Sequence, residues 1–145
     1  RPERSTAMSA EEHKAHDRRI VEEGLNGKNL AVLDEVAATD VVAHSPTGTT
    51  QGLDAYKQYI GAYFAAFPDL RFTIEAQLAE GDQSVIHWIA RGTHQGPLAG
   101  IPATGKQPTT PGVTLTRWAN GKAVEVWTYF DNLRLMQELG VMPAR

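Results

Sequence analysis

The sequence predicts one α+β domain in which a curved antiparallel sheet wraps around a long helix. Three observations support this fold class. Helical patterns fill the first half of the chain, and alternating strand patterns fill the second half. The two-residue turn Asn120–Gly121 is typical of a β-hairpin. The stretch 52–67 has a broad aromatic stripe at helical spacing and ends at Pro68.

Length and composition restrict the possible functions. The chain has 145 residues, the size of one domain with one core. Its net charge of −3 gives no basic field for nucleic acid, and no apolar run approaches the about 20 residues that cross a bilayer. It contains no cysteine, which excludes disulfides, thiolate nucleophiles and cysteine-zinc sites and fits a cytoplasmic location. We expect residues 1–8 to be disordered or an expression remnant, and residues 9–145 to form the single domain.

The first helix is expected to begin after Ser9, a good capping residue, and to end near Leu25. Its apolar positions are few, so we expect it to lie on the surface as a lid or flank. In that position, His13 and His16 are exposed to solvent. A second short helix is expected at 30–37.

A short strand is expected at 40–44, followed by a loop around Gly48. The long helix at 52–67 comes next, and its aromatic stripe could pack as core or contact a ligand. A meander of four antiparallel strands follows, with the expected ranges 71–79, 84–93, 106–118 and 123–130. The glycine-rich stretch 92–105 is expected to be a loop. Such a sheet forms a cone around the helix and leaves a pocket for a small apolar ligand.

The stretch 124–140 changes from strand to helical periodicity at Asp131. Trp127 and Tyr129 share a strand face with Asp131, so we expect this face to line the pocket. Burial beside these aromatic rings would raise the pKa of the Asp131 carboxyl above its usual value of about 3.9 and suit it to acid–base catalysis. Asp131 could also cap the closing helix, and the two roles are compatible.

The histidines offer weaker signals. His44 could polarise a substrate carbonyl at the pocket wall, or it could be tied to the loop that follows it. His94 is expected mainly to brace its turn, and His87 to lie on the outer or dimer side of the sheet. His13 and His16, three residues apart on a helix, are the only pair near a metal-ligating spacing, so no metal site is expected. The sequence also has no GxSxG elbow, P-loop or GxGxxG motif.

Several short motifs resemble one known family. They are VVAHSP at 41–46, GLDAYK at 52–57, AFPDL at 66–70, AEGD at 79–82, RGTHQG at 91–96, GIPATGK at 100–106 and the closing run 127–140. From 13 to 140 the chain resembles the SnoaL-like polyketide cyclases of the NTF2-like superfamily, especially the branch of ester cyclases. The resemblance implies the NTF2-like cone, and a cofactor-free intramolecular aldol condensation that closes a ring of an aromatic polyketide. It also implies a homodimer or homotetramer formed through the sheet.

The resemblance further implies site residues. It places the acid–base carboxylate at Asp131 and a pocket histidine at His44, while the second histidine of the family falls near Arg117 of this chain. We expect a small hydrophobic or polyketide-like ligand, and no cofactor, metal, nucleic acid or membrane partner. The expected ligand contacts are Trp127, Tyr129, His94, Arg117, Trp88, Tyr59, Tyr63, Phe64, Phe67 and Met136.

Two other functions stay open from the sequence. The same cone could hold a hydrophobic ligand without converting it. It could also carry out a different reaction, such as ketosteroid-type isomerisation or epoxide hydrolysis. The hydrolase needs an Asp–Arg–Asp group, of which Asp131 and Arg117 supply two members. The isomerase needs a tyrosine, such as Tyr129 or Tyr59, and a second protonated carboxyl.

Overall fold

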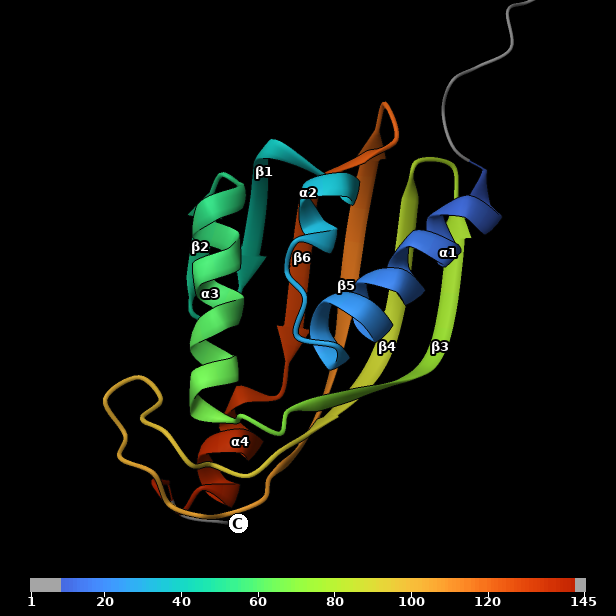
Figure 1. Cartoon of the computed structure of the whole chain (residues 1–145). Helices are drawn as coiled ribbons and strands as arrows, with labels where there is room; N and C mark the ends of the chain where they lie inside the picture. The colour runs from blue at the N-terminus through green and yellow to red at the C-terminus, as the bar shows by residue number, and fades with distance from the viewer. Residues whose placement is uncertain (1–8, 143–145) are drawn as a thin grey trace, which may run out of the picture.

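The computed structural model describes residues 9–142 as a curved six-stranded sheet with helices against its concave face (Figure 1). The strands are β1 (Ala37–Ser45), β2 (Gly48–Gln51), β3 (Arg71–Glu80), β4 (Gln83–Arg91), β5 (Thr109–Ala119) and β6 (Lys122–Phe130). They lie in the order β2-β1-β6-β5-β4-β3. Strands β3 to β6 form the predicted antiparallel meander, and β1 pairs with β6 in parallel. The predicted α+β cone is therefore confirmed.

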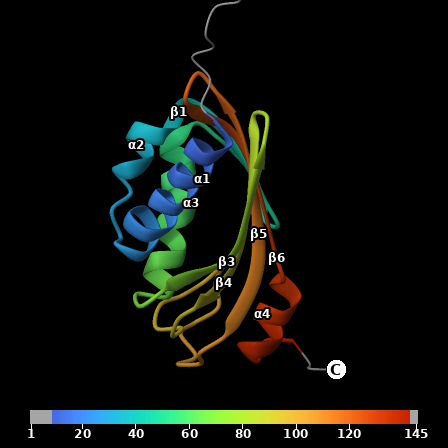
Figure 2. The same cartoon turned by 90° about the vertical axis from the view of Figure 1, so that its right-hand side faces the viewer.

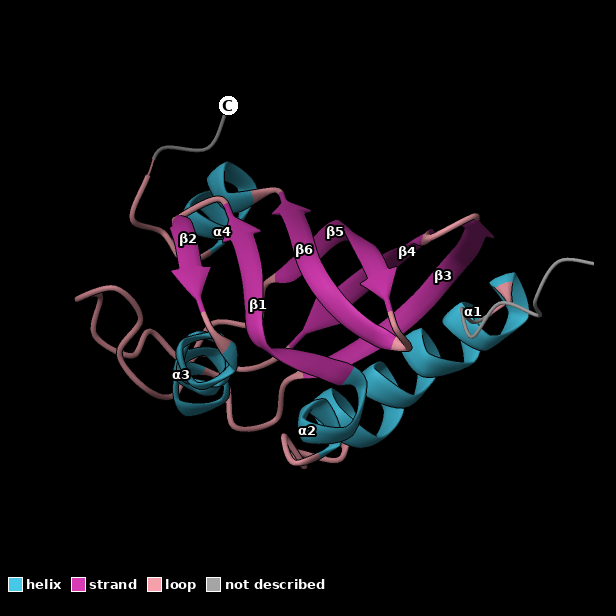
Figure 3. Ribbon diagram, turned by 90° about the horizontal axis from the view of Figure 1, so that it is seen from above, coloured by secondary structure: helices cyan, strands magenta, loops and turns pink. Residues whose placement is uncertain are grey.

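The helices are α1 (Ala10–Arg19), which continues into the wider π-helical segment η1 (Ile20–Asn26), α2 (Val32–Val36), α3 (Leu53–Ala66) and α4 (Asn132–Glu138). The first three α-helices lie on one side of the sheet (Figures 2 and 3). Helix α4 and the loop 92–108 lie together at one end, which we call the mouth of the cone. The expected extra segment at 1–8 lies outside the described residues.

Helix α1 flanks the sheet, with one face packed on β3 and β4 and most of its residues exposed or half-buried. A capping box starts it, in which the Glu12 N–H donates to Ser9 Oγ at 3.1 Å and the Ser9 N–H donates to Glu12 Oε1 at 2.8 Å. The positions that α1 buries are polar, since His13 is 2% exposed and Asp17 is 4% exposed. The expectation of an exposed His13 is therefore wrong. Hydrophobic periodicity could not identify this buried face, because His13 and Asp17 are polar.

Segment η1 is fixed to the free edge of the sheet by one side chain. Asn26 Nδ2 donates to the Phe72 carbonyl at 2.9 Å, and the Phe72 N–H donates to Asn26 Oδ1 at 2.7 Å. The amide thus satisfies both backbone groups of Phe72 on the outermost strand, β3. An edge strand covered in this way is less open to pairing with another chain.

Strand β2 stands where the sequence predicted only a loop around Gly48. It forms a hairpin with β1, in which Ser45 is paired with Gly48 and His44 with Thr49. The sequence GTTQ has no apolar alternation because this edge strand is almost wholly exposed. Hydrophobic periodicity therefore could not predict strand β2.

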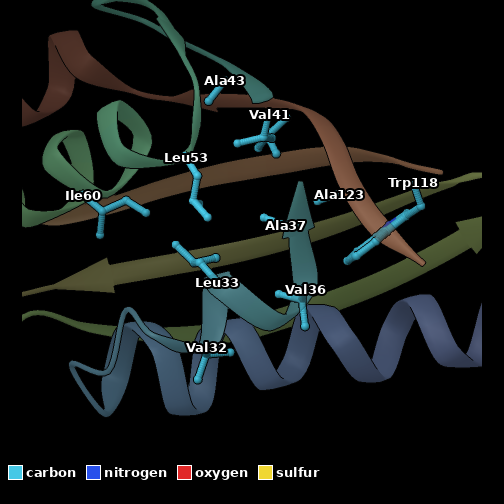
Figure 4. Close-up of a cluster of buried hydrophobic side chains, with 11 residues drawn as sticks. Val32, Leu33, Val36, Ala37, Val41, Ala43, Leu53, Ile60, Trp118 and Ala123 are labelled. Carbon is cyan, nitrogen blue, oxygen red and sulfur yellow. The ribbon is translucent and has the colours of Figure 1, made fainter. Parts of the chain in front are cut away.

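Two clusters of buried apolar side chains fill the concave side. The first lies between α2, α3 and the strands β1 and β6 (Figure 4), and it consists of Val32, Leu33, Val36, Ala37, Val41, Ala43, Leu53, Ile60, Trp118, Ala123 and Val126. The second lies nearer the mouth and consists of Val21, Ala66, Phe67, Leu70, Ile86, Trp88, Ala90, Leu98, Leu135 and Leu139. Phe64 of α3 packs against both clusters. The aromatic stripe of α3 therefore joins the two halves of the core.

The position of Trp88 depends on a glycine in the next strand. Gly112 of β5 pairs with Trp88 on one side and with Phe130 on the other. A Cβ atom at Gly112 would overlap the Trp88 indole and come within 3.0 Å of Phe130 Cβ. The absence of a side chain at Gly112 leaves room for the indole of Trp88 to pack over β5.

We expect Gly112→Ala to lower the free energy of unfolding by about 1–3 kcal/mol, because the added methyl group overpacks the core. Gly61→Ala in α3 is the matched control. A Cβ there meets nothing within 4 Å, and alanine should stabilise the helix by up to about 1 kcal/mol. Urea unfolding of both variants measures the difference. Equal stability of Gly112→Ala and the parent would contradict the packing described here.

Candidate functional site

A cavity between the helices and the concave face of the sheet consists of two adjoining chambers. The inner chamber has a volume of about 110 Å³, and the outer chamber, toward the mouth, has a volume of about 90 Å³. Both are lined by Tyr59, Tyr63, Leu70, Trp88 and Thr128, so these side chains stand where the chambers meet. The cone therefore contains the expected pocket, with mainly apolar walls.

The inner chamber is lined by one carboxyl group, that of Asp17 on α1. Burial raises the pKa of this carboxyl from its ordinary value of 3.8 to about 6. A hydrogen bond with the Ser84 side chain opposes part of that rise. Ser84 Oγ also accepts a hydrogen bond from Trp118 Nε1 at 2.9 Å. Because the indole N–H occupies an acceptor position of Ser84, the Ser84 hydroxyl can donate its hydrogen to Asp17.

Asp17 could not be recognised as buried from periodicity, because the helix that carries it has few apolar residues. One signal was present: His13, Asp17 and Val21 are spaced four residues apart and so fall on one helix face. Val21 is 1% exposed, and the two polar residues continue its buried face toward the N-terminus. A charged residue in line with a buried valine is an indication of a buried titratable group.

Three tyrosines of α3 also line the inner chamber: Tyr56, Tyr59 and Tyr63. Burial raises the pKa of each phenol, so all three hydroxyls stay protonated at neutral pH and can donate hydrogen bonds. Tyr59 and Tyr63 hydrogen-bond to each other, and Tyr56 is near enough to Asp17 for the two to interact electrostatically. The chamber thus combines a carboxyl that titrates near neutral pH with uncharged donors.

The two histidines of α1 surround the indole that contacts Ser84. The ring of His13 stacks on Trp118, with ring centroids 5.2 Å apart, and the ring of His16 meets the same indole edge-on at 5.8 Å. Burial lowers the pKa of His13, which favours the neutral imidazole at neutral pH. Neither histidine lines a chamber. The two imidazole rings pack on Trp118, and Trp118 in turn contacts Ser84 beside Asp17.

Some of the expected ligand contacts do line the cavity. Trp88, Tyr59 and Tyr63 reach both chambers, whereas Phe64 lines the inner chamber and Phe67 the outer one. Trp88 is held by a hydrogen bond from its Nε1 to Thr114 Oγ1 at 3.0 Å. The helical stripe thus serves both as core and as cavity wall, the two alternatives that the sequence left open.

Strand β6 turns the opposite face to the cavity from the one expected. Val126, Thr128 and Phe130 line the chambers. Trp127 and Tyr129 lie on the other, convex face, where Tyr129 is 59% exposed. Both faces of β6 carry large apolar side chains, so alternation alone could not tell which one is inside. The expectation that Trp127 and Tyr129 line the pocket is corrected accordingly.

Asp131 caps α4. Its Oδ1 accepts a hydrogen bond from the Arg134 N–H at 3.0 Å, and the residue is exposed. Asp131 follows Phe130, but its side chain lines neither chamber. The sequence allowed Asp131 to cap the helix, to act in catalysis, or both. The structure shows the capping role.

His44 and Arg117 meet in a charged cluster on the convex face. His44 Nε2 lies 2.7 Å from Glu125 Oε2, and His44 Nδ1 lies 3.0 Å from Thr49 Oγ1. Arg117 Nη2 lies 3.3 Å from Glu125 Oε1. The hydrogen bond with His44 lowers the pKa of Glu125. The ring of His44 also stacks on Trp127 at 5.4 Å. These residues are neighbours, but the sheet separates them from the cavity.

The remaining expected contacts support the loop and core. His94 is fully buried, its Nδ1 accepts a hydrogen bond from the Thr104 N–H at 3.2 Å, and its ring packs on Phe67. Met136 packs against the second cluster. Neither lines a chamber. The bracing role predicted for His94 matches these contacts.

Within residues 9–142, no group of three or more His, Asp or Glu side chains is arranged to hold a metal ion. None of the helices in this part of the chain has the length and apolar character needed to cross a membrane.

Comparison with solved structures gives several close fold matches. AclR from Streptomyces galilaeus, provisionally assigned as a hydroxylase, is 27% identical, with a TM-score of 0.83 over 93% of this chain and 100% of that one. IdmH from Streptomyces antibioticus, provisionally assigned as a polyketide cyclase, is 28% identical, with a TM-score of 0.77 over 88% and 98%. A protein from Jannaschia sp. CCS1, provisionally assigned as a SnoaL-like polyketide cyclase, has a TM-score of 0.87 at 23% identity over 99% and 100%.

Sequence comparison agrees with the fold. Among curated proteins, no sequence matches this chain. The family model described as SnoaL-like polyketide cyclase matches residues 15–139, from within α1 to the end of α4. The chain belongs to the SnoaL-like polyketide cyclase family.

Proposed function

We propose that this protein is a cofactor-independent enzyme that closes a ring of a small polyketide-like substrate by intramolecular aldol condensation, with Asp17 as its acid–base group. Family membership supports the reaction class. The observation that carries the proposal is a carboxyl group with a pKa of about 6 in the wall of an apolar chamber. Acid–base groups work best when their pKa lies near the operating pH.

The proposed reaction needs one base and one stabilised oxygen. The ionised Asp17 carboxylate removes a proton from a carbon next to a substrate carbonyl. The resulting enolate carbon attacks a second carbonyl of the same molecule, forming the new C–C bond. Asp17 then returns its proton to the alkoxide oxygen, so no co-reactant is consumed. The neutral hydroxyls of Tyr56, Tyr59 and Tyr63 are suited to hydrogen-bond the oxygens on which charge develops.

The chamber also favours the reaction by positioning the substrate and excluding water. A polyketide chain that is folded inside apolar walls holds its two carbonyl groups near each other, which lowers the entropic cost of ring closure. Exclusion of water also strengthens the hydrogen bonds to the enolate. The same walls without turnover would make the protein a carrier of a hydrophobic ligand, the alternative function.

Asp131 is the alternative acid–base group, from the family resemblance. Its Oδ1 is engaged by the Arg134 N–H. To act on a ligand in the outer chamber, the carboxylate would have to leave this cap and turn inward past Phe130. His44 as its partner would have to reach the cavity from the convex face. These movements are the reason that we place the chemistry at Asp17.

We expect Asp17→Asn to slow α-proton exchange of a 1,3-diketone, 1-phenyl-1,3-butanedione, by about 10²–10⁴-fold, because the amide cannot accept the proton. The measurement is deuterium incorporation in D₂O followed by NMR. Asp131→Asn is the matched comparison and should keep the parental rate within a few-fold. The opposite pattern, with exchange lost in Asp131→Asn and kept in Asp17→Asn, would transfer the role to Asp131. Tight binding without exchange in the parent would favour a carrier.

The raised pKa of Asp17 predicts a pH dependence of stability. Between pH 4 and pH 6 the folded protein keeps a proton that the unfolded chain releases, so stability falls as the pH rises through this range. Because the pKa of Asp17 rises from 3.8 to about 6 on folding, ionisation of this carboxyl lowers the free energy of unfolding by about 3 kcal/mol at pH 7. Asp17→Asn removes this cost. The variant should therefore gain about that much relative to the parent between pH 4 and pH 7.

Urea unfolding at pH 4, 5, 6 and 7 measures this gain. Asp40→Asn, on an exposed position of β1, controls for the loss of one negative charge. If the difference between parent and Asp17→Asn stayed the same at every pH, the carboxyl would be ionised as in the unfolded chain, and it would lose its suitability as a base.

We also propose a homodimer formed through the convex face. Apolar side chains gather on the outward side of β4, β5 and β6, namely Val85, Ile89, Val113, Leu115, Trp127 and Tyr129. Val113 and Tyr129 are among the exposed large apolar residues. An exposed apolar patch of this kind is typical of a protein–protein contact.

Analytical ultracentrifugation tests the dimer. Val113→Lys should shift the protein to the monomer, since it places a charge in the centre of the patch. Ala62→Lys, at an exposed position of α3, adds the same charge on the other side of the molecule and should leave the dimer intact. If the parent protein sediments as a monomer, the proposed homodimer is wrong.

A further inference from the structure

A chain of buried polar contacts runs from β5 through β4 to the Asp17 carboxyl on α1. Trp118 of β5 donates its indole N–H to Ser84 Oγ at 2.9 Å, and the Ser84 side chain hydrogen-bonds to Asp17. None of the three residues is more than 4% exposed. Because water has so little access to them, these groups depend on one another for their hydrogen bonds.

The direction of these hydrogen bonds follows from which groups can donate. An indole N–H is only a donor, so that of Trp118 uses a lone pair of Ser84 Oγ. The Ser84 hydroxyl still has its own hydrogen, and an ionised carboxylate can only accept. Trp118 therefore orients the Ser84 hydroxyl as a donor to Asp17. Hydrogen bonds to a charged group are stronger than neutral ones, and successive donors in a chain strengthen each other.

Several contacts hold the Trp118 indole in place. Its side chain belongs to the first buried cluster (Figure 4). The His13 imidazole stacks on it with an angle of 9° between the ring planes, and His16 meets it edge-on. The backbone N–H of Trp118 donates to the Asp82 carbonyl at 2.8 Å. The group that orients Ser84 is thus fixed by both its ring and its backbone.

The titratable groups around Asp17 act on it in other ways. His16 lowers the pKa of Asp17 electrostatically, an effect that depends on the charge of the imidazole. Tyr56 interacts with Asp17 from α3 and stays uncharged at neutral pH, because burial raises the pKa of its phenol. Asp82, in the β3–β4 turn, interacts with His13. The serine hydroxyl carries no charge, so its hydrogen bond acts on Asp17 whether or not the imidazoles are protonated.

We infer that Ser84 and Trp118 are positioning residues for Asp17. The indole N–H fixes the serine hydroxyl as a donor, and the hydroxyl holds one carboxylate oxygen and favours the ionised form that removes the substrate proton. This inference rests on the proposed function, since it concerns the acid–base group of the same site. A hydroxyl has one hydrogen to donate, so it leaves the second carboxylate oxygen to the chamber that Asp17 lines.

Direct titration of Asp17 tests this hydrogen bond without relying on any reaction. The signal is the side-chain carboxyl carbon of protein labelled with ¹³C-aspartate, followed by NMR against pH and assigned by its loss in Asp17→Asn. The parent should titrate at about pH 6. Ser84→Ala removes a donor to the charged form, so its midpoint should rise by about one pH unit. Trp118→Phe should raise the midpoint by about half a unit, because the serine hydroxyl loses the donor that orients it.

Trp118→Phe also removes part of a buried ring, so a second replacement keeps the shape of the side chain. 3-Benzothienylalanine in place of Trp118 has sulfur where the indole has its N–H and retains the bicyclic ring. It should give the same rise as Trp118→Phe, and it decides the matter if Trp118→Phe does not fold. If Ser84→Ala shifts the midpoint and the benzothienyl replacement does not, the role of the indole N–H is wrong.

The pH dependence of proton exchange separates positioning from a general loss of structure. At pH 6, Ser84→Ala should exchange the α-proton of 1-phenyl-1,3-butanedione about 5-fold more slowly than the parent, since about one-tenth of its Asp17 is ionised there instead of about half. At pH 8 Asp17 is ionised in both proteins, and the rates above the uncatalysed background should agree within about 2-fold. A rate that falls by the same factor at every pH would indicate a purely structural role and overturn the inference.

Thr116→Val is the matched control for a lost hydroxyl. Thr116 of β5 pairs directly with Ser84 and lines the same chamber, whereas the side chains that act on the pKa of Asp17 are those of Ser84 and His16. The midpoint of Asp17 should be the same in Thr116→Val as in the parent. An equal rise in this variant would assign the effect to the polarity of the chamber and overturn the inference.

His16→Gln removes the imidazole whose charge acts on Asp17. In this background, Ser84→Ala should still raise the midpoint by about one pH unit, because the hydrogen bond does not depend on the imidazole. If the rise disappears, the effect belongs to His16 and the inference is wrong.

The remaining outcomes separate this inference from the proposed function. If Ser84→Ala titrates like the parent while proton exchange still depends on Asp17, the positioning role is wrong and the proposed function stands. If the midpoint of Asp17 shifts as expected but the parent catalyses no exchange, the hydrogen-bond chain stands and the proposed function is wrong. An unchanged midpoint together with no exchange in the parent removes both.

Discussion

The docking of α1 onto the sheet is a polar contact, and the cavity depends on it. His13 and Asp17 occupy the buried positions of this helix, where most amphipathic helices carry aliphatic side chains. Asp17 is tied through Ser84 to Trp118, which is itself covered by His13. This arrangement holds α1 over β3 and β4 by hydrogen bonds and ring stacking. A buried carboxyl is retained at a cost in stability, and carboxyl groups with perturbed pKa values cluster at functional sites.

The cavity walls are shared with the core, which links stability to function. Trp88 belongs to the second buried cluster, lines both chambers and lies over Gly112 of the next strand. Tyr59 and Tyr63 stand beside it at the junction and hydrogen-bond to each other. A substitution that moves Trp88 therefore changes the wall that the two chambers share. The shape of the cavity therefore depends in part on the packing of strands β4, β5 and β6.

Hydrophobic periodicity and turn residues predicted much of the fold. Asn120–Gly121 marked the β5–β6 hairpin, and the aromatic stripe at 52–67 identified α3 and much of the cavity wall. Periodicity could not orient β6, because Phe130 and Trp127 give its two faces similar apolar character. It also missed the exposed edge strand β2, which buries no face, and Asp17, whose burial depends on partners more than sixty residues away in the chain.

The parallel pairing of β1 with β6 has a consequence for how the chain folds. Residues 37–45 form their sheet contact with residues 122–130, so this part of the sheet cannot form until nearly the whole chain has been synthesised. Until then the hairpin of β1 and β2, on which α3 packs, is not joined to the rest of the sheet. While residues 67–121 are being synthesised, α3 and β1 therefore lack the core partners that β5 and β6 provide, a state that is prone to association with other chains and open to chaperones.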